Sequence, residues 1–260
     1  MPRLILLDLD DTLLRSDKTI SAYSARVLAA CQERGMLVAF ATARGESNIL
    51  PFVEQVRPDI VISSGGALIR CHGEIIDAQM FSGDETAAIL GAGIRLMGRE
   101  CLMTVDTLDA YYGNYAGDAT GILTGWGEVR WADFETFREP SLKICVHLPG
   151  DAHAQEVAAA VPGCDWLRFT GGQWYKFTRA NINKERAAAR LSELLRVPAQ
   201  DMIAFGDDTS DIGMLRYCGM GVAVANAIDE VKAAAKMIVA SQDDDGPAAY
   251  LATHVLGEAL

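Results

Sequence analysis

Short apolar runs alternate with longer amphipathic stretches at the start of this chain. Three apolar runs are predicted as strands buried on both faces: Leu4 to Leu9, Met36 to Ala41, and Asp59 to Ser63. Two stretches between them are predicted as helices: Ser21 to Arg34 and Ser47 to Val56. Ser21 is a typical N-cap residue and Gly35 a typical helix stop. This alternation predicts a parallel sheet with right-handed crossovers.

A hairpin is predicted over Ala67 to Asp77, turning at His72 and Gly73. From about residue 82 the pattern indicates a separate α+β unit. Its predicted elements are a helix from Ser82 to Arg99, a strand from Leu142 to Leu148, a helix from Asp151 to Val161, and a hairpin of Trp166 to Thr170 with Trp174 to Thr178 that turns on Gly171 and Gly172. The first pattern then returns with a helix from Lys184 to Leu195 and strands at Met202 to Phe205, Gly221 to Val224 and Met237 to Val239, with a helix between the last two strands.

The expected fold class is therefore α/β, with a Rossmann-like parallel-sheet core and an inserted α+β domain. We expect the core to comprise residues 1–81 and 180–260, and the inserted domain residues 82–179.

The composition is that of an ordinary folded protein of 260 residues, half of them hydrophobic. A net charge of -12 argues against binding to nucleic acid or an anionic membrane, because the average field repels phosphate groups. The cysteines form no paired motif and no cluster with histidines, so reduced thiols in the cytoplasm are expected. No apolar stretch reaches the roughly 20 residues that span a bilayer, and no secretory leader is expected. The oligomeric state stays open.

Three carboxylates end the first apolar run: Asp8, Asp10 and Asp11. Like charges so close destabilise one another unless a cation or a proton intervenes, so we predict a divalent metal between them. On an extended segment residues i and i+2 share a face, which would let Asp8 and Asp10 reach the same substrate. Asp11 is interpreted as a turn residue.

Further polar side chains follow other predicted strands. Thr42 and Arg44 follow the second strand, Lys184 opens a late helix, and the acidic run from Gly206 to Asp211 follows a later strand. Because ligands bind beyond the carboxyl ends of parallel strands, we expect these groups to form one site. Its carboxylates suit Mg²⁺, while Thr42 and Lys184 can donate to phosphoryl oxygens.

In chain order, four segments resemble the motifs of the haloacid dehalogenase-like phosphatase superfamily: DLDDTLL at 8–14, the threonine of ATAR at 41–44, Lys184, and GDDTSD at 206–211. The insertion between the second and third motifs is similar to the class IIB cap of Cof-type phosphatases. The resemblance implies a Mg²⁺-dependent phosphomonoester hydrolase that forms an aspartyl phosphate. Its implied substrate is a small phosphorylated metabolite, with sugar phosphates the expected class.

The resemblance also implies individual roles. Asp8 would be the nucleophile and a metal ligand, and Asp10 the general acid and base that binds the metal through its backbone carbonyl. Asp207 would be a further metal ligand, and Asp211 would help to hold either the metal shell or Lys184. Asp208 is interpreted as a turn or helix cap.

The transferring phosphoryl group would be bound by Thr42 and Lys184. Arg44, Gly66 and Asn226 are further candidate positions for binding phosphate or substrate.

The chain departs from the family pattern at three positions. Gly65 stands where an asparagine is usual, Ser210 replaces a second asparagine, and Lys176 replaces a glutamate. Lys176 is either an anion-binding residue or a solvated strand residue, and the solvated interpretation is slightly favoured. Asn226 either hydrogen-bonds near the site or caps a helix that begins at Ala227.

Two alternatives to hydrolysis remain. A phosphohexomutase of the phosphomannomutase type would pass the aspartyl phosphate to a second hydroxyl. A non-catalytic metabolite-binding protein would keep the fold without turnover, although all four motifs carry residue types competent for catalysis.

Overall fold

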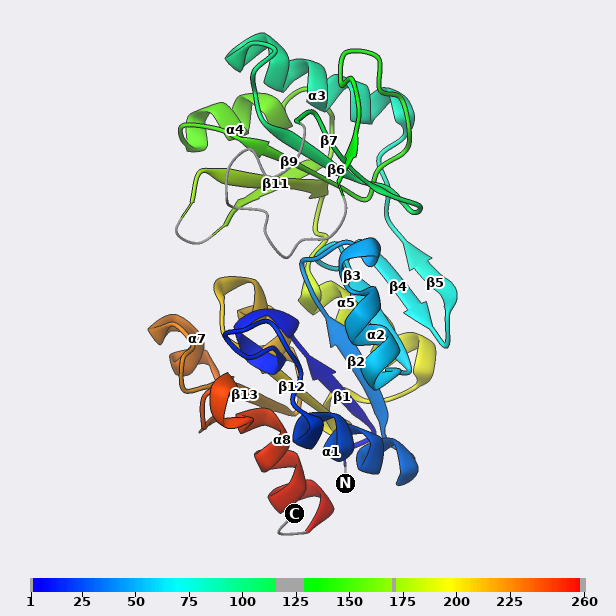
Figure 1. Ribbon diagram of the computed structural model, residues 1–260, viewed down its shortest axis with the longest axis vertical. Helices are drawn as coiled ribbons and strands as arrows, with labels where there is room; N and C mark the ends of the chain where they lie inside the picture. The colour runs from blue at the N-terminus through cyan, green and yellow to red at the C-terminus, as the bar shows by residue number, and fades with distance from the viewer. Residues whose placement is uncertain (1, 116–128, 170–171, 258–260) are drawn as a thin grey trace. The chain divides into compact units, whose positions relative to one another are not determined.

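The computed structural model describes residues 2–115, 129–169 and 172–257 (Figure 1). The chain divides into two compact units, each described by itself below. Unit 1 comprises Met1–Ala43, Leu50–Ile76 and Asn183–Leu260; unit 2 comprises Arg44–Ile49 and Asp77–Ile182. The predicted domain limits at 81/82 and 179/180 stay a prediction, and the short segment Arg44–Ile49 was not expected to group with the inserted unit.

Unit 1 is built on a sheet whose central strands are parallel. In spatial order its strands are β14 (Met237–Val239), β13 (Met220–Val224), β12 (Met202–Gly206), β1 (Leu4–Leu7), β2 (Leu37–Ala41), β3 (Ile60–Ser63), β4 (Leu68–Cys71) and β5 (Glu74–Ala78). From β14 to β3 neighbouring strands are parallel, and β4 pairs with β3 antiparallel. The hairpin turn is as predicted, with His72 and Gly73 both at positive φ.

Helices cover both faces of this sheet (Figure 1). Their bounds are α1 (Ala22–Glu33), α2 (Leu50–Val56), α5 (Lys184–Leu195), α6 (Ile212–Tyr217), α7 (Asp229–Ala234) and α8 (Gly246–Tyr250). Leu4 and Leu6 pack with α5, α6 and α7 in one apolar core. On the other face Phe205 of β12 meets Tyr250 of α8, with ring centroids 5.8 Å apart. Burial on both faces explains why β1 lacks an alternating polar pattern.

The predicted start and stop of the first helix are confirmed. The Ser21 hydroxyl accepts from the Ser24 N–H at 2.9 Å, and Gly35 at φ 79° follows the C-cap residue Arg34. The short helices α6 and α8 were not predicted from the sequence.

In its described residues, unit 2 is a mostly antiparallel sheet with the helices α3 and α4. Its strands lie in the order β10 (Cys164–Arg168), β11 (Trp174–Arg179), β9 (Lys143–His147), β6 (Met103–Asp106), β7 (Tyr111–Gly113) and β8 (Arg130–Trp131). Helices α3 (Gly83–Met97) and α4 (Asp151–Ala158) pack with one face of this sheet around an apolar core. The predicted turn residue Gly171 lies outside the described residues. Lys176 of β11 is 6% exposed, so the predicted solvated interpretation of Lys176 is wrong. The predicted fold class, a parallel α/β core with an inserted α+β unit, is confirmed.

In the part of the chain that the structure describes, no helix is both long and apolar enough to cross a membrane.

Candidate active site

The first acidic residue is held at the middle of the sheet of unit 1. The N–H of Asp8 donates to the carbonyl of Phe205 at 3.1 Å, which continues the pairing of β1 with β12. The chain then makes a wide turn over Leu9–Leu13, closed by the Leu14 N–H on the Leu9 carbonyl at 2.8 Å. The predicted extension of the strand to Leu9 is therefore wrong. Asp11 has φ 57° and is a turn residue, as interpreted from the sequence.

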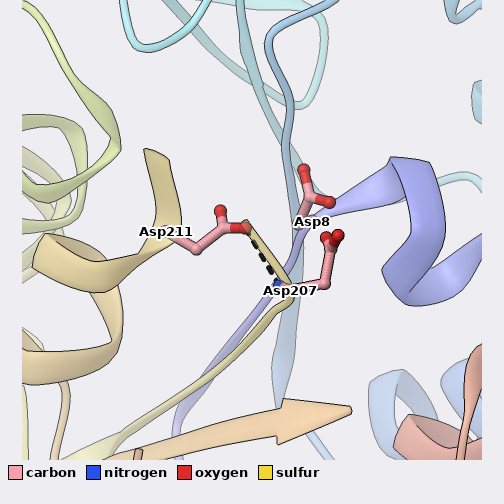
Figure 2. Close-up of side chains that lie close together, drawn as sticks. All are labelled: Asp8, Asp207 and Asp211. Atoms are coloured by element: carbon pink, nitrogen blue, oxygen red, sulfur yellow. Dashed lines mark hydrogen bonds between the residues drawn. The ribbon is translucent and has the colours of Figure 1, made fainter. Parts of the chain in front are cut away.

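Three carboxylates and one ammonium group converge beyond the strand ends. Asp8, Asp207 and Asp211 each offer an oxygen within 4.8 Å of the others (Figure 2). The Lys184 Nζ donates to Asp8 Oδ1 at 2.5 Å and to Asp211 Oδ1 at 2.6 Å. The structure therefore brings together residues from three of the four sequence motifs.

Asp211 is the most constrained of the three acids. Its Oδ2 accepts from the backbone N–H groups of Asp207 at 3.1 Å and Asp208 at 3.2 Å, while Oδ1 accepts from Lys184. Both oxygens are thus engaged, which favours the predicted alternative in which Asp211 holds Lys184. Asp208 accepts from the Thr209 N–H at 2.7 Å and caps the short helical turn Thr209–Asp211, as interpreted.

Asp10 lies apart from this cluster. Its Oδ1 lies 3.4 Å from Lys18 Nζ, and the same ammonium group donates to Asp11 at 3.1 Å. The side chain of Asp10 is 30% exposed, whereas that of Asp8 is 8% exposed. Asp10 is therefore ion-paired with Lys18 and is not one of the three clustered acids.

The buried charges shift one another's proton affinity. Burial raises the pKa of Asp8 well above its usual range, although Lys184 favours the charged form. Burial raises the pKa of Asp207 to about 7, and the charge of Asp211 adds to this. Burial disfavours the charged ammonium of Lys184, but Asp211 and Asp8 outweigh that effect and raise its pKa. Negative charge therefore exceeds positive charge in the cluster.

The donor set fits a divalent cation. Carboxylate oxygens are the ligands that Mg²⁺ prefers, and Asp8, Asp207 and Asp211 each offer one within 4.8 Å of the others. The Thr12 hydroxyl, which sequence reasoning missed, donates to Asp207 Oδ1 at 2.8 Å and fixes the orientation of that carboxylate.

Thr42 follows β2 directly and is 1% exposed. Its carbonyl accepts from the Gly65 N–H at 2.9 Å, which ties the loops after β2 and β3 together. Ser64, which the sequence did not single out, has a fully buried hydroxyl with no hydrogen-bond partner within the described ranges. This hydroxyl is a further polar group at the end of β3.

Gly66 has a structural reason to be glycine. Its φ is 105°, and a Cβ there would overlap the carbonyl of Asn183. Asn183 is the N-cap of α5 and accepts from the Arg186 N–H at 2.8 Å. Gly66 therefore lets the loop after β3 approach the start of α5, where Lys184 is the first residue.

Arg44 and Asn226 are the remaining candidates. Arg44 is 2% exposed and groups with unit 2. Asn226 donates to the Asp11 carbonyl at 2.6 Å and accepts from the Gln242 N–H at 3.2 Å. The N-cap of α7 is Ile228, so the helix-capping interpretation of Asn226 is wrong. Asn226 instead holds the turn that carries the acidic motif.

A model of the haloacid dehalogenase-like hydrolases matches residues 5–251. The chain belongs to this family. The predicted resemblance is thereby confirmed, and the match runs through both units of this hydrolase.

Curated relatives are similar over nearly their whole length. The hydrolase is 26% identical over 268 residues to 5-amino-6-(5-phospho-D-ribitylamino)uracil phosphatase YitU of Bacillus subtilis, covering 96% of each chain. It is 25% identical over 250 residues to phosphoglycolate phosphatase of Archaeoglobus fulgidus, covering 94% of this chain and 93% of that one. The prediction of a phosphatase-type enzyme is confirmed.

Solved structures show the same fold. A superfamily phosphatase from Bacteroides thetaiotaomicron has a TM-score of 0.82 at 22% identity, covering 96% of this chain and 94% of that one. A subclass IIB sugar phosphatase also has a TM-score of 0.82, at 20% identity, covering 96% and 97%. The fold of this hydrolase is that of the superfamily.

Replacing Asp207 with Asn should stabilise the metal-free protein at pH 8. The folded-state pKa of Asp207, about 7, exceeds an unfolded value of about 3.9, so the folded state holds more protons between these values and stability falls as the pH rises through them. Asp207→Asn removes this loss, which we place at about 1–4 kcal/mol. Urea unfolding in EDTA at pH 4 and pH 8 measures the free energy of unfolding of the wild type and the variant. If the variant differs from the wild type by the same amount at both pH values, the explanation is contradicted. Asp208→Asn is the control.

Gly66→Ala should lower kcat strongly in a protein that still folds. The new Cβ meets the Asn183 carbonyl and displaces the start of α5 with Lys184. Gly73→Ala is a matched control, since Gly73 also has positive φ (85°) but nothing within 4 Å of its Cβ position. Both variants should lose about 1 kcal/mol through backbone strain, and Gly66→Ala should lose more because its Cβ overlaps the Asn183 carbonyl. Only Gly66→Ala should lose about tenfold or more in kcat; equal activities of the two variants would disprove this positioning role.

Proposed function

We propose that this protein is a Mg²⁺-dependent phosphomonoester hydrolase in which Asp8 forms an aspartyl phosphate. The observation that carries the proposal is the position of Lys184 Nζ, which bonds to Asp8 and Asp211 while Asp207 lies within reach of both acids. A carboxylate held by an ammonium group is oriented for attack on phosphorus, and the same positive charge would stabilise the negative phosphoryl oxygens.

The first half of the reaction forms a bond from a carboxylate oxygen of Asp8 to phosphorus and breaks the bond to the ester oxygen. Asp10, carrying a proton, would give it to the departing alkoxide. In the second half Asp10 would take a proton from water as the water oxygen attacks phosphorus. This releases inorganic phosphate and restores the carboxylate of Asp8. The separation of Asp10 from the clustered acids supports this division.

Asp8 and Asp207, together with the backbone carbonyl of Asp10, would hold Mg²⁺, while Asp211 would mainly hold Lys184. The ion would supply positive charge that offsets the negative charge of the phosphoryl group. Thr42 would donate to a phosphoryl oxygen from the end of β2.

The proposed substrate is a small phosphorylated metabolite, with sugar phosphates as the starting class. The relatives act on substrates as different as a ribitylamino-uracil phosphate and phosphoglycolate, so the choice must depend on residues of this chain. We propose that unit 2 is the cap that makes this choice. The six free cysteines support a cytoplasmic location. The mutase and the non-catalytic alternatives are not favoured, because the curated relatives are phosphatases.

Asp8→Asn should abolish phosphate release from p-nitrophenyl phosphate. The neutral amide is a poor nucleophile, so kcat should fall by about 10³-fold or more. Asp208→Asn makes the same chemical change in a residue that caps a helical turn, and asparagine also caps well. This control should keep activity within about twofold of the wild type.

Removal of metal with EDTA should also stop turnover, and Mg²⁺ should restore it. Wild-type protein that releases no phosphate with Mg²⁺ present, or an Asp8→Asn variant as active as the wild type, would refute the proposed function.

A further inference from the structure

The turn that carries Asp10 leaves the sheet of unit 1. Strand β1 ends at Leu7 and the turn comprises Leu9–Leu13, so strand pairing positions Asp8 but does not position Asp10. Within the turn Asp11 has φ 57°, a left-handed conformation that is unfavourable for residues other than glycine. Such a conformation persists where the surrounding structure holds it. Contacts from outside the turn therefore help to determine where Asp10 lies.

Asn226 makes one of these contacts. It lies in the loop after β13, and its Nδ2 donates to the Asp11 carbonyl at 2.6 Å, while its Oδ1 accepts from the Gln242 N–H at 3.2 Å. A carbonyl can only accept and a backbone N–H can only donate, so these two bonds fix which end of the amide faces each partner. The amide thus joins the turn after β1 to the loop after β14.

The loop after β14 also bonds to the chain just beyond the turn. The Ser16 N–H and hydroxyl donate to the two carboxylate oxygens of Asp243, at 2.8 and 2.6 Å. Arg15 donates to both carboxylate oxygens of Asp245, at 3.3 and 2.5 Å. Gln242 Nε2 donates to the Ser16 hydroxyl at 3.3 Å. The amide contact and these bonds therefore hold the turn after β1 on both sides.

The loop that carries Asn226 reaches the second acidic loop as well. The Ile228 N–H donates to the backbone carbonyl of Asp207 at 3.1 Å. Thr12, within the turn, donates to the carboxylate of Asp207 at 2.8 Å. All these residues belong to unit 1. The loop after β13 thus connects the turn with Asp10 to the loop with Asp207.

We propose that Asn226 is a positioning residue for Asp10. The inference rests on the proposed function and deepens it: through its bond to the Asp11 carbonyl, the amide holds the turn in the conformation from which Asp10 gives its proton to the departing alkoxide. Asp8 is held separately, by strand pairing and by Lys184. Loss of the amide should therefore impair protonation of the leaving group more than attack on phosphorus.

Two esters of similar shape separate these two effects. p-Nitrophenyl phosphate releases a stable anion that needs no proton, whereas p-nitrobenzyl phosphate releases a strongly basic alkoxide that needs one. Because kcat/KM covers the steps up to the departure of this group, later hydrolysis of the aspartyl phosphate does not affect it. Asn226→Ala should lower kcat/KM about tenfold or more for the benzyl ester but about threefold or less for the phenyl ester. Equal losses for the two esters overturn the inference.

Two further variants test which bond matters. Asn226→Asp keeps an acceptor for the Gln242 N–H but cannot donate to the Asp11 carbonyl, so it should show the same unequal losses. Asn114→Ala is the matched control, because the Asn114 amide also donates to a backbone carbonyl, at 2.7 Å, and accepts from a backbone N–H, at 2.9 Å, but lies in unit 2. It should change both kcat/KM values by the same factor. Equal losses in Asn226→Asp, or unequal losses in Asn114→Ala, overturn the inference.

Hydrogen exchange separates this inference from the proposed function, because it reads the turn without turnover. The backbone amide hydrogens of Leu14 and Ser16 are hydrogen-bonded in the wild type. In Asn226→Ala they should exchange about threefold faster or more, and in Asn114→Ala at the wild-type rate. Faster exchange in Asn226→Ala supports the positioning contact even if the wild-type protein hydrolyses neither ester, in which case the proposed function fails. Unchanged exchange overturns the inference, and the proposed function stands if the wild type hydrolyses the esters.

Discussion

Crowding of negative charge at the ends of β1 and β12 is the constraint on which the site depends. The parallel pairing of these strands brings Asp8 and Asp207 together, and the turn after β12 adds Asp211. Lys184 bonds to two of these acids and compensates only part of the charge, so burial still raises the pKa of Asp8 and Asp207. A cluster with more carboxylates than ammonium groups attracts further positive charge, so it is suited to hold a divalent cation.

The position of Lys184 depends in turn on backbone contacts that involve no charge. It is the first residue of α5, whose N-cap Asn183 lies against the backbone of Gly66. Gly66 belongs to the loop after β3, and Gly65 in the same loop donates to Thr42. One glycine-rich loop thus fixes both the ammonium group and the threonine, and small displacements of such groups lower rates strongly.

Unit 2 uses the alternation of strand side chains for two purposes. One face of its sheet forms the apolar core with α3 and α4, while the other carries the buried residues Lys143, Lys176 and Asp106. The first face stabilises the unit, and the second provides charges whose arrangement is costly without opposite charge nearby. The opposite faces of the same strands therefore hold the apolar core and a group of buried charges.

The sequence alone determined the alternation of strands and helices in unit 1 and the motif acids at the strand ends, because apolar periodicity and residue type are local properties. It missed the helices α6 and α8. It also missed Lys18 and Thr12, the partners of Asp10 and Asp207, because no local signal marks such long-range pairs. Burial of Lys176 and the grouping of Arg44 with unit 2 were decided only by tertiary structure. A residue's neighbours across strands depend on register and packing, which join segments far apart in the chain.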